Sequence, residues 1–385
     1  MPIVTARTAF SRVRLAALAA SIVLIVLGVI QSMPPSHVTI EVGPVGGSFY
    51  QIAQHYQKFF ATRGIDLEIR PRDNSLEIMN DLVNPASGID IGFEAQDVNQ
   101  YRHAAVYTVG HIQLQPLFVF ANANLGRRIV LSDLRGRNII MPPLNSATTA
   151  AAVRMFDLYD ITPENTTFAN APLADAAKAL RAGKYDAGVF MLAPENDVIR
   201  EMANDSGLRL VPFAEAKAIS NHLPFLRPIV LPRGIYDIAD GVPPTDVAML
   251  AGTVDVVVRA GMHPYIIQTL LQAMAEEHRG ATFLSGAGTY PTISGPELTV
   301  QPLADDYYRS GTPWVYRNLP PWLASCVDHS LLAARTICAL CELSRSTHYL
   351  AEFSNGLLAA RLWWRRWRRP TGEASTTSDA DPNAR

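Results

Sequence analysis

The fold is decided by the stretch Val38-Thr39-Ile40-Glu41-Val42-Gly43-Pro44-Val45-Gly46-Gly47-Ser48-Phe49-Tyr50. Its first five residues alternate between apolar and polar side chains, which predicts a strand. The glycines and the proline that follow predict a turn. Apolar side chains then recur at helical spacing from Phe49 to Phe60, and Gly64 ends that pattern. Strand, glycine-rich loop and helix in this order predict the first unit of an α/β fold.

The alternation of strands and helices continues directly along the chain. A second strand is predicted at residues 67–70, and Asn74 and Ser75 predict the cap of a helix over residues 76–83. A third strand is predicted at residues 89–93. The βαβαβ order predicts a largely parallel sheet that is covered by helices.

A second α/β module follows a long apolar segment at residues 114–120, which we interpret as a strand that crosses between two lobes. The predicted elements of this module are a strand at 138–141, a loop at 142–149 that opens a helix reaching Tyr159, a helix at 174–181 and a strand at 185–190. Two similar modules side by side predict two lobes with a cleft between them.

The chain then turns back through residues 228–232 and 253–258 and forms a predicted helix from His263 to His278. Such a return makes the first lobe discontinuous in sequence. The predicted division is lobe 1 at residues 38–120 and 229–324, lobe 2 at residues 121–228, an N-terminal segment at residues 1–37 and a C-terminal tail at residues 325–385.

Both turn-rich loops lie at the carboxyl end of a predicted strand and open a helix. Ligands of open α/β sheets bind at this edge, where helix N-termini offer N–H groups to anions. The Gly46–Ser48 backbone and the Ser146–Thr149 hydroxyls are therefore the predicted anion-binding groups, one loop from each lobe. A Gly-Gly-Ser loop alone is more often simply a turn, so this prediction depends on the two loops together.

The N-terminus predicts insertion into a membrane. Arg7, Arg12 and Arg14 precede an uncharged and mostly apolar stretch from Leu15 to Met33, which is long enough to cross the hydrocarbon core. The arginines are expected to stay in the cytoplasm, so the rest of the chain is exported. No small-x-small cleavage pattern follows. An uncleaved anchor is therefore favoured, and a cleaved signal peptide is the alternative.

The C-terminal part gives weaker signals. The three cysteines, Cys326, Cys338 and Cys341, all lie there, so no disulfide is expected in the body of the protein. A lone CxxC without a second pair supports neither zinc nor redox chemistry. The tryptophan- and arginine-rich run at residues 361–369 suits an anchor at a lipid interface, and a disordered basic tail is the alternative.

Several segments of the chain, in order, resemble the TAXI-type solute receptors of TRAP transporters, over about residues 38–324. The segments that carry the resemblance are Val42–Tyr50, Ser75-Leu76-Glu77, Asp90–Phe93, Gln115–Phe120, Asp133–Arg137, Ala179–Ala187, Leu231–Asp237, Arg259–Pro264, Tyr307–Gly311 and Leu319–Leu323. The resemblance implies a two-lobed periplasmic-binding-protein fold (type II-like), to which the N-terminal segment adds the predicted transmembrane helix. It also implies a periplasmic receptor that delivers a small carboxylate or amino acid to membrane permease subunits. With the predicted anchor, this receptor is expected at the inner membrane, facing the periplasm.

The resemblance also implies the ligand contacts. Carried over by position, they are Gly46, Gly47, Ser48, Phe49, Tyr50, Asn74, Ser75, Glu94, Gln96, Ser146, Ala147, Thr148 and Thr149, with Phe190 and Met191 as apolar walls. The chain departs from the family pattern at three positions. It has Ala147 where a glycine is common, Ile78 where an asparagine is common, and Gln115 where an acidic residue is common.

Other classes of protein are less well supported. A formal net charge of −2 provides no basic surface for a nucleic acid. Ser48 does not lie in the Gly-x-Ser-x-Gly elbow of hydrolases. Glu94 and Asp97 could act as an acid/base pair, but no further catalytic partner is evident. We therefore expect no enzyme, catalytic residue, cofactor or metal. A ligand sensor that signals to a membrane partner without transport is the alternative function.

Overall fold

The computed structural model describes residues 33–95, 97–126, 128–295 and 298–319. These ranges do not include residues 15–32 of the predicted membrane segment, the site residue Gln96, the three cysteines or the tail at residues 325–385. Within them, no helix is long and apolar enough to cross a membrane.

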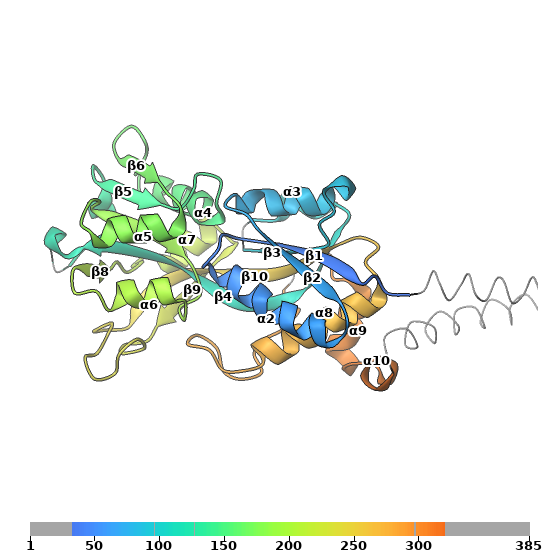
Figure 1. Ribbon diagram of the computed structural model, residues 1–385. Coiled ribbons are helices and arrows are strands. Elements are labelled where there is room, and N and C mark those ends of the chain that lie inside the picture. Colours follow the sequence, from blue (N-terminus) through green and yellow to red (C-terminus); the bar gives the residue numbers. More distant parts are fainter. Residues whose placement is uncertain (1–32, 96, 127, 296–297, 320–385) are drawn as a thin grey trace, which may run out of the picture. The chain divides into compact units, whose positions relative to one another are not determined.

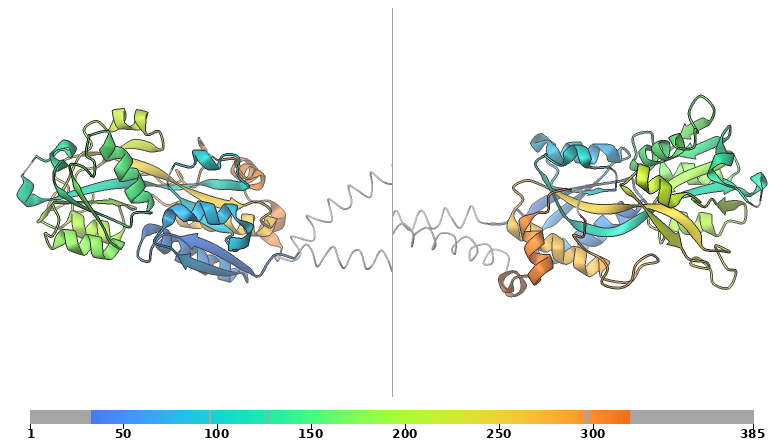
Figure 2. Two further views of the ribbon diagram at one scale, coloured as in Figure 1. Left: turned by 90° about the horizontal axis from the view of Figure 1, so that it is seen from above. Right: turned by 180° about the vertical axis from the view of Figure 1, so that it is seen from behind.

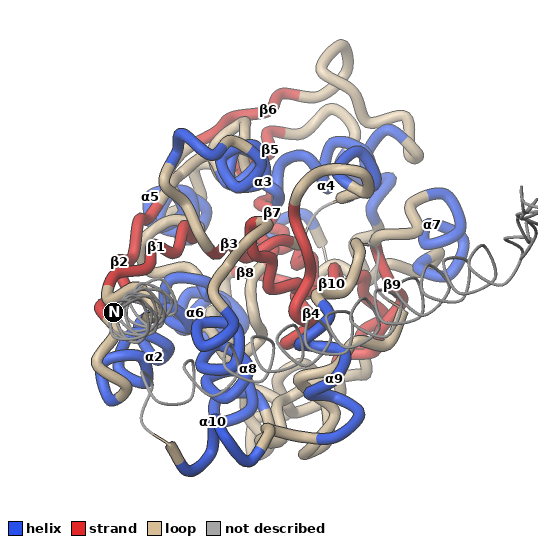
Figure 3. The backbone as a smooth tube through the Cα atoms, turned by 90° about the vertical axis from the view of Figure 1, so that its right-hand side faces the viewer, coloured by secondary structure: helices blue, strands red, loops and turns tan. Residues whose placement is uncertain are grey.

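Lobe 1 contains the βαβαβ unit that the sequence predicts. Strands β1 (His37–Val42), β2 (Asp66–Pro71) and β3 (Ile91–Glu94) pair in parallel in the order β2-β1-β3. Helix α2 (Ser48–Thr62) follows β1, and a 3₁₀ turn (Ser75–Glu77) continues into α3 (Ile78–Val83). Figure 3 shows α3 on one side of these strands and α2 on the other. The parallel pairing places the loops after β1 and β2 at the same edge of the sheet.

Lobe 2 repeats this arrangement. Its strands are β5 (Asn138–Met141), β6 (Thr167–Asn170) and β7 (Ala187–Met191), with β8 (Leu208–Leu210) beside β4. Strand β5 pairs in parallel with both β6 and β7. Its helices are α4 (Ala147–Asp157), α5 (Leu173–Arg181), α6 (Asp197–Ala203) and α7 (Ala216–His222). The sequence patterns predicted β5, β7, α4 and α5.

Two long antiparallel strands, β4 (Val106–Asn122) and β10 (Val247–Arg259), join the lobes. They lie at the centre of the strand order β2-β1-β3-β10-β4-β7-β5-β6 (Figures 1 and 2). The pairing shifts register between Val254 and Asp255 and between Val256 and Val257. Such bulges bend a strand, and here they lie at the start of and within the part of β10, Asp255–Val258, that also pairs with β3 of lobe 1.

The return to lobe 1 differs in detail from the prediction. Strand β9 (Leu226–Leu231), which we expected to begin that return, pairs with the first half of β10, and β10 itself then crosses back. Pro228 has no N–H to donate and lies in β9, which among the described residues pairs with β10 alone. After β10, helix α8 (Pro264–His278) packs against α2, and α9 (Pro302–Ser310) packs against α8. A short helix, α10 (Trp314–Asn318), follows.

Candidate functional site

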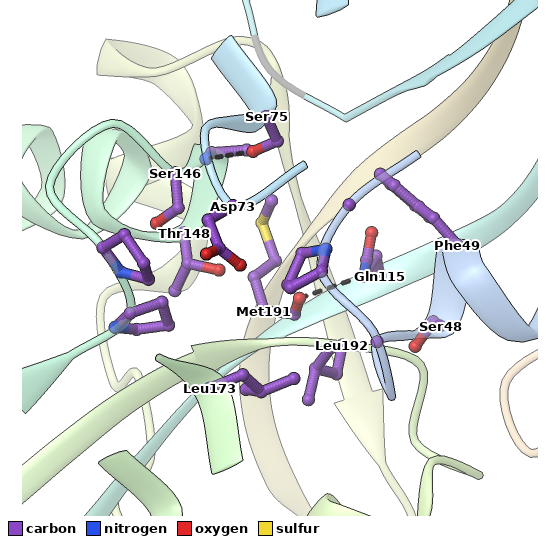
Figure 4. A pocket seen from close by; sticks show the side chains of 16 residues that line it. Ser48, Phe49, Asp73, Ser75, Gln115, Ser146, Thr148, Leu173, Met191 and Leu192 are labelled. Atoms are coloured by element: carbon purple, nitrogen blue, oxygen red, sulfur yellow. Dashed lines mark hydrogen bonds between the residues drawn. The ribbon is translucent and has the colours of Figure 1, made fainter. Parts of the chain in front are cut away.

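A pocket lies between the two lobes, at the edge where the sequence predicts binding (Figure 4). Lobe 1 contributes Gly43, Pro44, Gly47, Ser48, Phe49, Asp73 and Ser75. Lobe 2 contributes Pro142, Pro143, Ser146, Ala147, Thr148, Leu173, Met191 and Leu192, and Gln115 comes from the crossing strand β4. The walls are thus mostly apolar, with a few polar groups, as is common for small-molecule sites.

The glycine-rich loop of lobe 1 forms a tight turn before α2. The Gly47 N–H donates to the Pro44 carbonyl over 3.0 Å, and Gly46 has a φ of +83°, a conformation that favours glycine. Gly47 is the N-cap of α2 and has no side chain with which to cap it. The first N–H groups of α2 therefore receive no side-chain cap from this position.

The loop of lobe 2 ends in a conventional helix cap. Ser146 is the N-cap of α4, and its Oγ accepts a hydrogen bond from the Thr149 N–H over 3.2 Å. The Thr149 hydroxyl donates to the Pro142 carbonyl over 2.9 Å. Both hydroxyls therefore stabilise the loop itself, which the sequence alone did not predict.

Two predicted contact residues join the lobes directly. Ser48 Oγ, in lobe 1, accepts from the Ala193 N–H of lobe 2 over 2.9 Å. Ser75 Oγ accepts from the Ala147 N–H, in the first turn of α4, also over 2.9 Å. Ser75 and Ser48 lie on opposite sides of the pocket (Figure 4), so the two hydrogen bonds hold its walls together in this conformation.

The pocket brings together half of the predicted contact residues. Those that line it are Gly47, Ser48, Phe49, Ser75, Ser146, Ala147 and Thr148, together with the predicted wall residue Met191. The predicted residues that do not line it are Gly46, Tyr50, Asn74, Glu94, Thr149 and Phe190. Neighbouring side chains of a strand point to opposite faces of the sheet. Met191 points to the face that borders the pocket, so Phe190 points to the other face, where it is fully buried.

Two of the other predicted residues outside the pocket, Gly46 and Glu94, have structural contacts of their own. The Gly46 carbonyl accepts from Asn196 Nδ2 across the lobes, over 3.1 Å. Glu94 is buried, and its Oε1 accepts from the Ala95 N–H over 2.7 Å. Asn74 precedes the 3₁₀ turn, and its Oδ1 is buried without a hydrogen-bond partner among the described residues.

Sequence reasoning missed Asp73 and Gln115 as pocket residues. A signal for each was present: Asp73 directly precedes Asn74, and Gln115 is one of the three departures from the family pattern. Among the described residues that line the pocket, Asp73 carries the only formal charge. Gln115 is 4% exposed, and its Nε2 donates to the Met191 carbonyl over 3.0 Å.

An ion-pair cluster centred on Arg72 holds the loop that carries Asp73 and Ser75. The Arg72 guanidinium contacts Glu41 at 2.5 Å, Glu77 at 2.9 Å and Asp81 at 2.6 Å. Burial raises the pKa of Glu41, and the hydrogen bond from Arg72 opposes that rise. The cluster joins β1, the 3₁₀ turn and α3, so it fixes where the loop after β2 meets lobe 2.

The strand order, the two crossing strands and the pocket between the lobes define a two-lobed, periplasmic-binding-protein-like α/β protein. The chain belongs to the NMT1-like family, whose family model matches residues 95–291. No curated protein matches the sequence.

Similar solved structures are distant. A protein of Bordetella bronchiseptica RB50 is 15% identical, with a TM-score of 0.43 over 63% of this chain and 71% of that one. The alkanesulfonate-binding protein of Xanthomonas axonopodis pv. citri is 14% identical, with a TM-score of 0.40 over 63% and 73%. An ancestral arginine-binding protein is 13% identical, with a TM-score of 0.41 over 65% and 95%.

Proposed function

We propose that this protein is an extracytoplasmic receptor that captures a small solute between its lobes and delivers it to a TRAP-type permease. The observation that carries the proposal is the pocket, whose walls come from both lobes and are joined by the hydrogen bonds of Ser48 and Ser75. A solute enclosed there contacts both lobes and stabilises the closed form. Membership of the NMT1-like family supports the receptor role, and the TAXI resemblance supports the TRAP permease as partner.

Binding is tested by thermal unfolding of the full-length protein, purified in detergent, with a library of amino acids, mono- and dicarboxylates and amines. A ligand at a hundredfold excess over its Kd stabilises the folded state by about 2.7 kcal/mol, which raises the Tm. A Gly47→Val variant, in which the pocket wall is changed, serves as the control and is expected to show no shift. A library in which no compound raises the Tm of the unaltered protein contradicts the receptor proposal.

The proposal includes export and a membrane anchor at the N-terminus, with the binding domain in the periplasm. A reporter enzyme fused after Met33 is expected to be active only when it is exported, because the three arginines before Leu15 favour the cytoplasm. Activity of a reporter that works only in the cytoplasm contradicts this topology. Recovery of the protein in the soluble fraction contradicts the anchor and leaves the receptor proposal in place.

The Ser75→Ala substitution is expected to weaken ligand binding about five- to a hundredfold, measured by calorimetry. In the closed form it leaves the Ala147 N–H without its partner, at a cost of about 1–3 kcal/mol. A ligand that binds only the closed form loses up to the same amount of affinity, and the full amount when the free protein is mostly open. Ser132→Ala, which removes an exposed hydroxyl of lobe 2, serves as the control and should not change affinity. Equal affinities for the two variants would show that the hydrogen bond between the lobes does not assist binding.

A further inference from the structure

The pocket contains a buried acceptor whose orientation is fixed. Because Gln115 Nε2 donates to the Met191 carbonyl, the Oε1 atom faces away from that carbonyl. Oε1 is buried and has no hydrogen-bond partner among the described residues. Figure 4 shows this amide beside Phe49 and Met191, within the ring of lining side chains. A buried acceptor without a partner costs stability, so Oε1 is a place where a donor on a ligand is favoured.

The charge of the pocket also favours a ligand that carries a positively charged donor. Asp73 is exposed and lines the pocket from the loop after β2, and no lysine, arginine or histidine is among the described lining residues. A solute whose charges are all carboxylates would meet this negative charge without a cationic side chain to balance it. A positively charged nitrogen would be attracted to Asp73.

The pocket also offers backbone donors at the start of one helix. The first turn of α2 borders the pocket and has no side-chain cap from Gly47, whereas in α4 the Ala147 and Thr149 N–H groups already donate to Ser75 and Ser146. The start of α2 therefore favours a carboxylate. Acceptors and a negative charge on one part of the wall, and a helix N-terminus on another, together suit a molecule that carries both an amino group and a carboxylate.

We propose that the solute bears a protonated amine, with an N–H that donates to Gln115 Oε1 and a positive charge balanced by Asp73. This inference rests on the proposed receptor function and narrows its substrate class. It assigns specificity to two residues, and it excludes solutes whose only charged groups are carboxylates.

The first test uses the unaltered full-length protein and matched compounds. Each of the common amino acids is compared by calorimetry with the α-hydroxy acid that has the same side chain, and dicarboxylates are included. At least one amino acid is expected to bind about ten- to a hundredfold more tightly than its hydroxy acid, because the hydroxyl carries no charge. Equal or tighter binding of hydroxy acids or dicarboxylates overturns the amine assignment and leaves the receptor proposal standing. If none of the compounds binds, both fail.

The second test changes the two acceptors. Gln115→Leu, which removes the acceptor, is expected to weaken binding of the amino compound about ten- to a hundredfold. Asp73→Asn should weaken it only about two- to fivefold, because Asp73 is exposed. The controls are Gln113→Leu on the same strand and Asp306→Asn on α9, which do not line the pocket. Full-strength binding of the amino compound by a folded Gln115→Leu protein overturns the proposal. If these variants do not fold, the matched compounds decide.

Discussion

Arg72→Met is expected to lower the free energy of unfolding by about 3 kcal/mol at neutral pH, because it leaves the buried Glu41 carboxylate without its partner. Glu41 is only 2% exposed, and one of its oxygens already lacks a hydrogen-bond partner among the described residues. The substitution also leaves Glu77 and Asp81 close to Glu41 with no cation between them. Urea unfolding followed by circular dichroism measures the change.

The effect of Arg72→Met should depend on pH. Burial raises the pKa of Glu41, and loss of the Arg72 hydrogen bond removes the main influence that opposes this rise. When a carboxyl group has a higher pKa in the folded state than in the unfolded state, the protein becomes less stable as the pH rises through the folded-state pKa. The difference between the variant and the unaltered protein should therefore be small below about pH 4 and grow toward pH 7.

Arg70→Met is the matched control, because Arg70 pairs with Glu68 at the surface of the same strand. Its effect on unfolding should be small, since both partners are exposed to solvent. Equal effects of the two substitutions would show that the Arg72 cluster has no special role in stability. In addition, only Arg72→Met should weaken solute binding, because Arg72 holds the loop that carries Asp73 and Ser75.

The α/β units were predictable because each one is local in sequence. The alternation at Val38–Val42 and the helical spacing after Gly47 depend only on neighbouring residues, and β1, α2, β2 and β3 form where these patterns predict. The full length of β4 was not predictable in this way. Its first half includes polar side chains such as Thr108, whose hydroxyl donates to Asp255 of β10 over 2.9 Å. A partner 147 positions away in the sequence cannot be identified from local periodicity.

The site was predictable in position but not in the roles of its side chains. Two loops at the carboxyl ends of strands are sufficient to predict a pocket between them. Which hydroxyls face a ligand depends on what else each can reach, and Ser146 reaches the first turn of its own helix while Ser48 reaches the other lobe. Gln115 was not predicted for a related reason. It lies in the segment at residues 114–120, whose other side chains are all apolar, and only the three-dimensional structure brings it to the pocket.

Gly47→Val is expected to weaken solute binding by about a hundredfold or more while the protein still unfolds cooperatively. Gly47 has φ −73° and ψ 162°, which a β-branched residue readily adopts, so the backbone should tolerate the change. However, a Cβ atom at this position would lie 3.0 Å from the Pro44 carbonyl oxygen. The turn must shift to admit it, and the two methyl groups are added at the wall of the pocket.

Calorimetry on three variants tests whether the side chain added at the pocket wall causes this loss of binding. Gly47→Ala adds the Cβ alone, so it should weaken binding less than valine does. Gly280→Val adds the same side chain where no atom lies within 4 Å of the new Cβ, outside the residues that line the pocket, and should bind as the unaltered protein does. Thermal unfolding of all three variants checks that each is folded. Full-strength binding by a folded Gly47→Val protein would place the solute away from the start of α2, and with it would remove the reason for assigning the pocket to the solute.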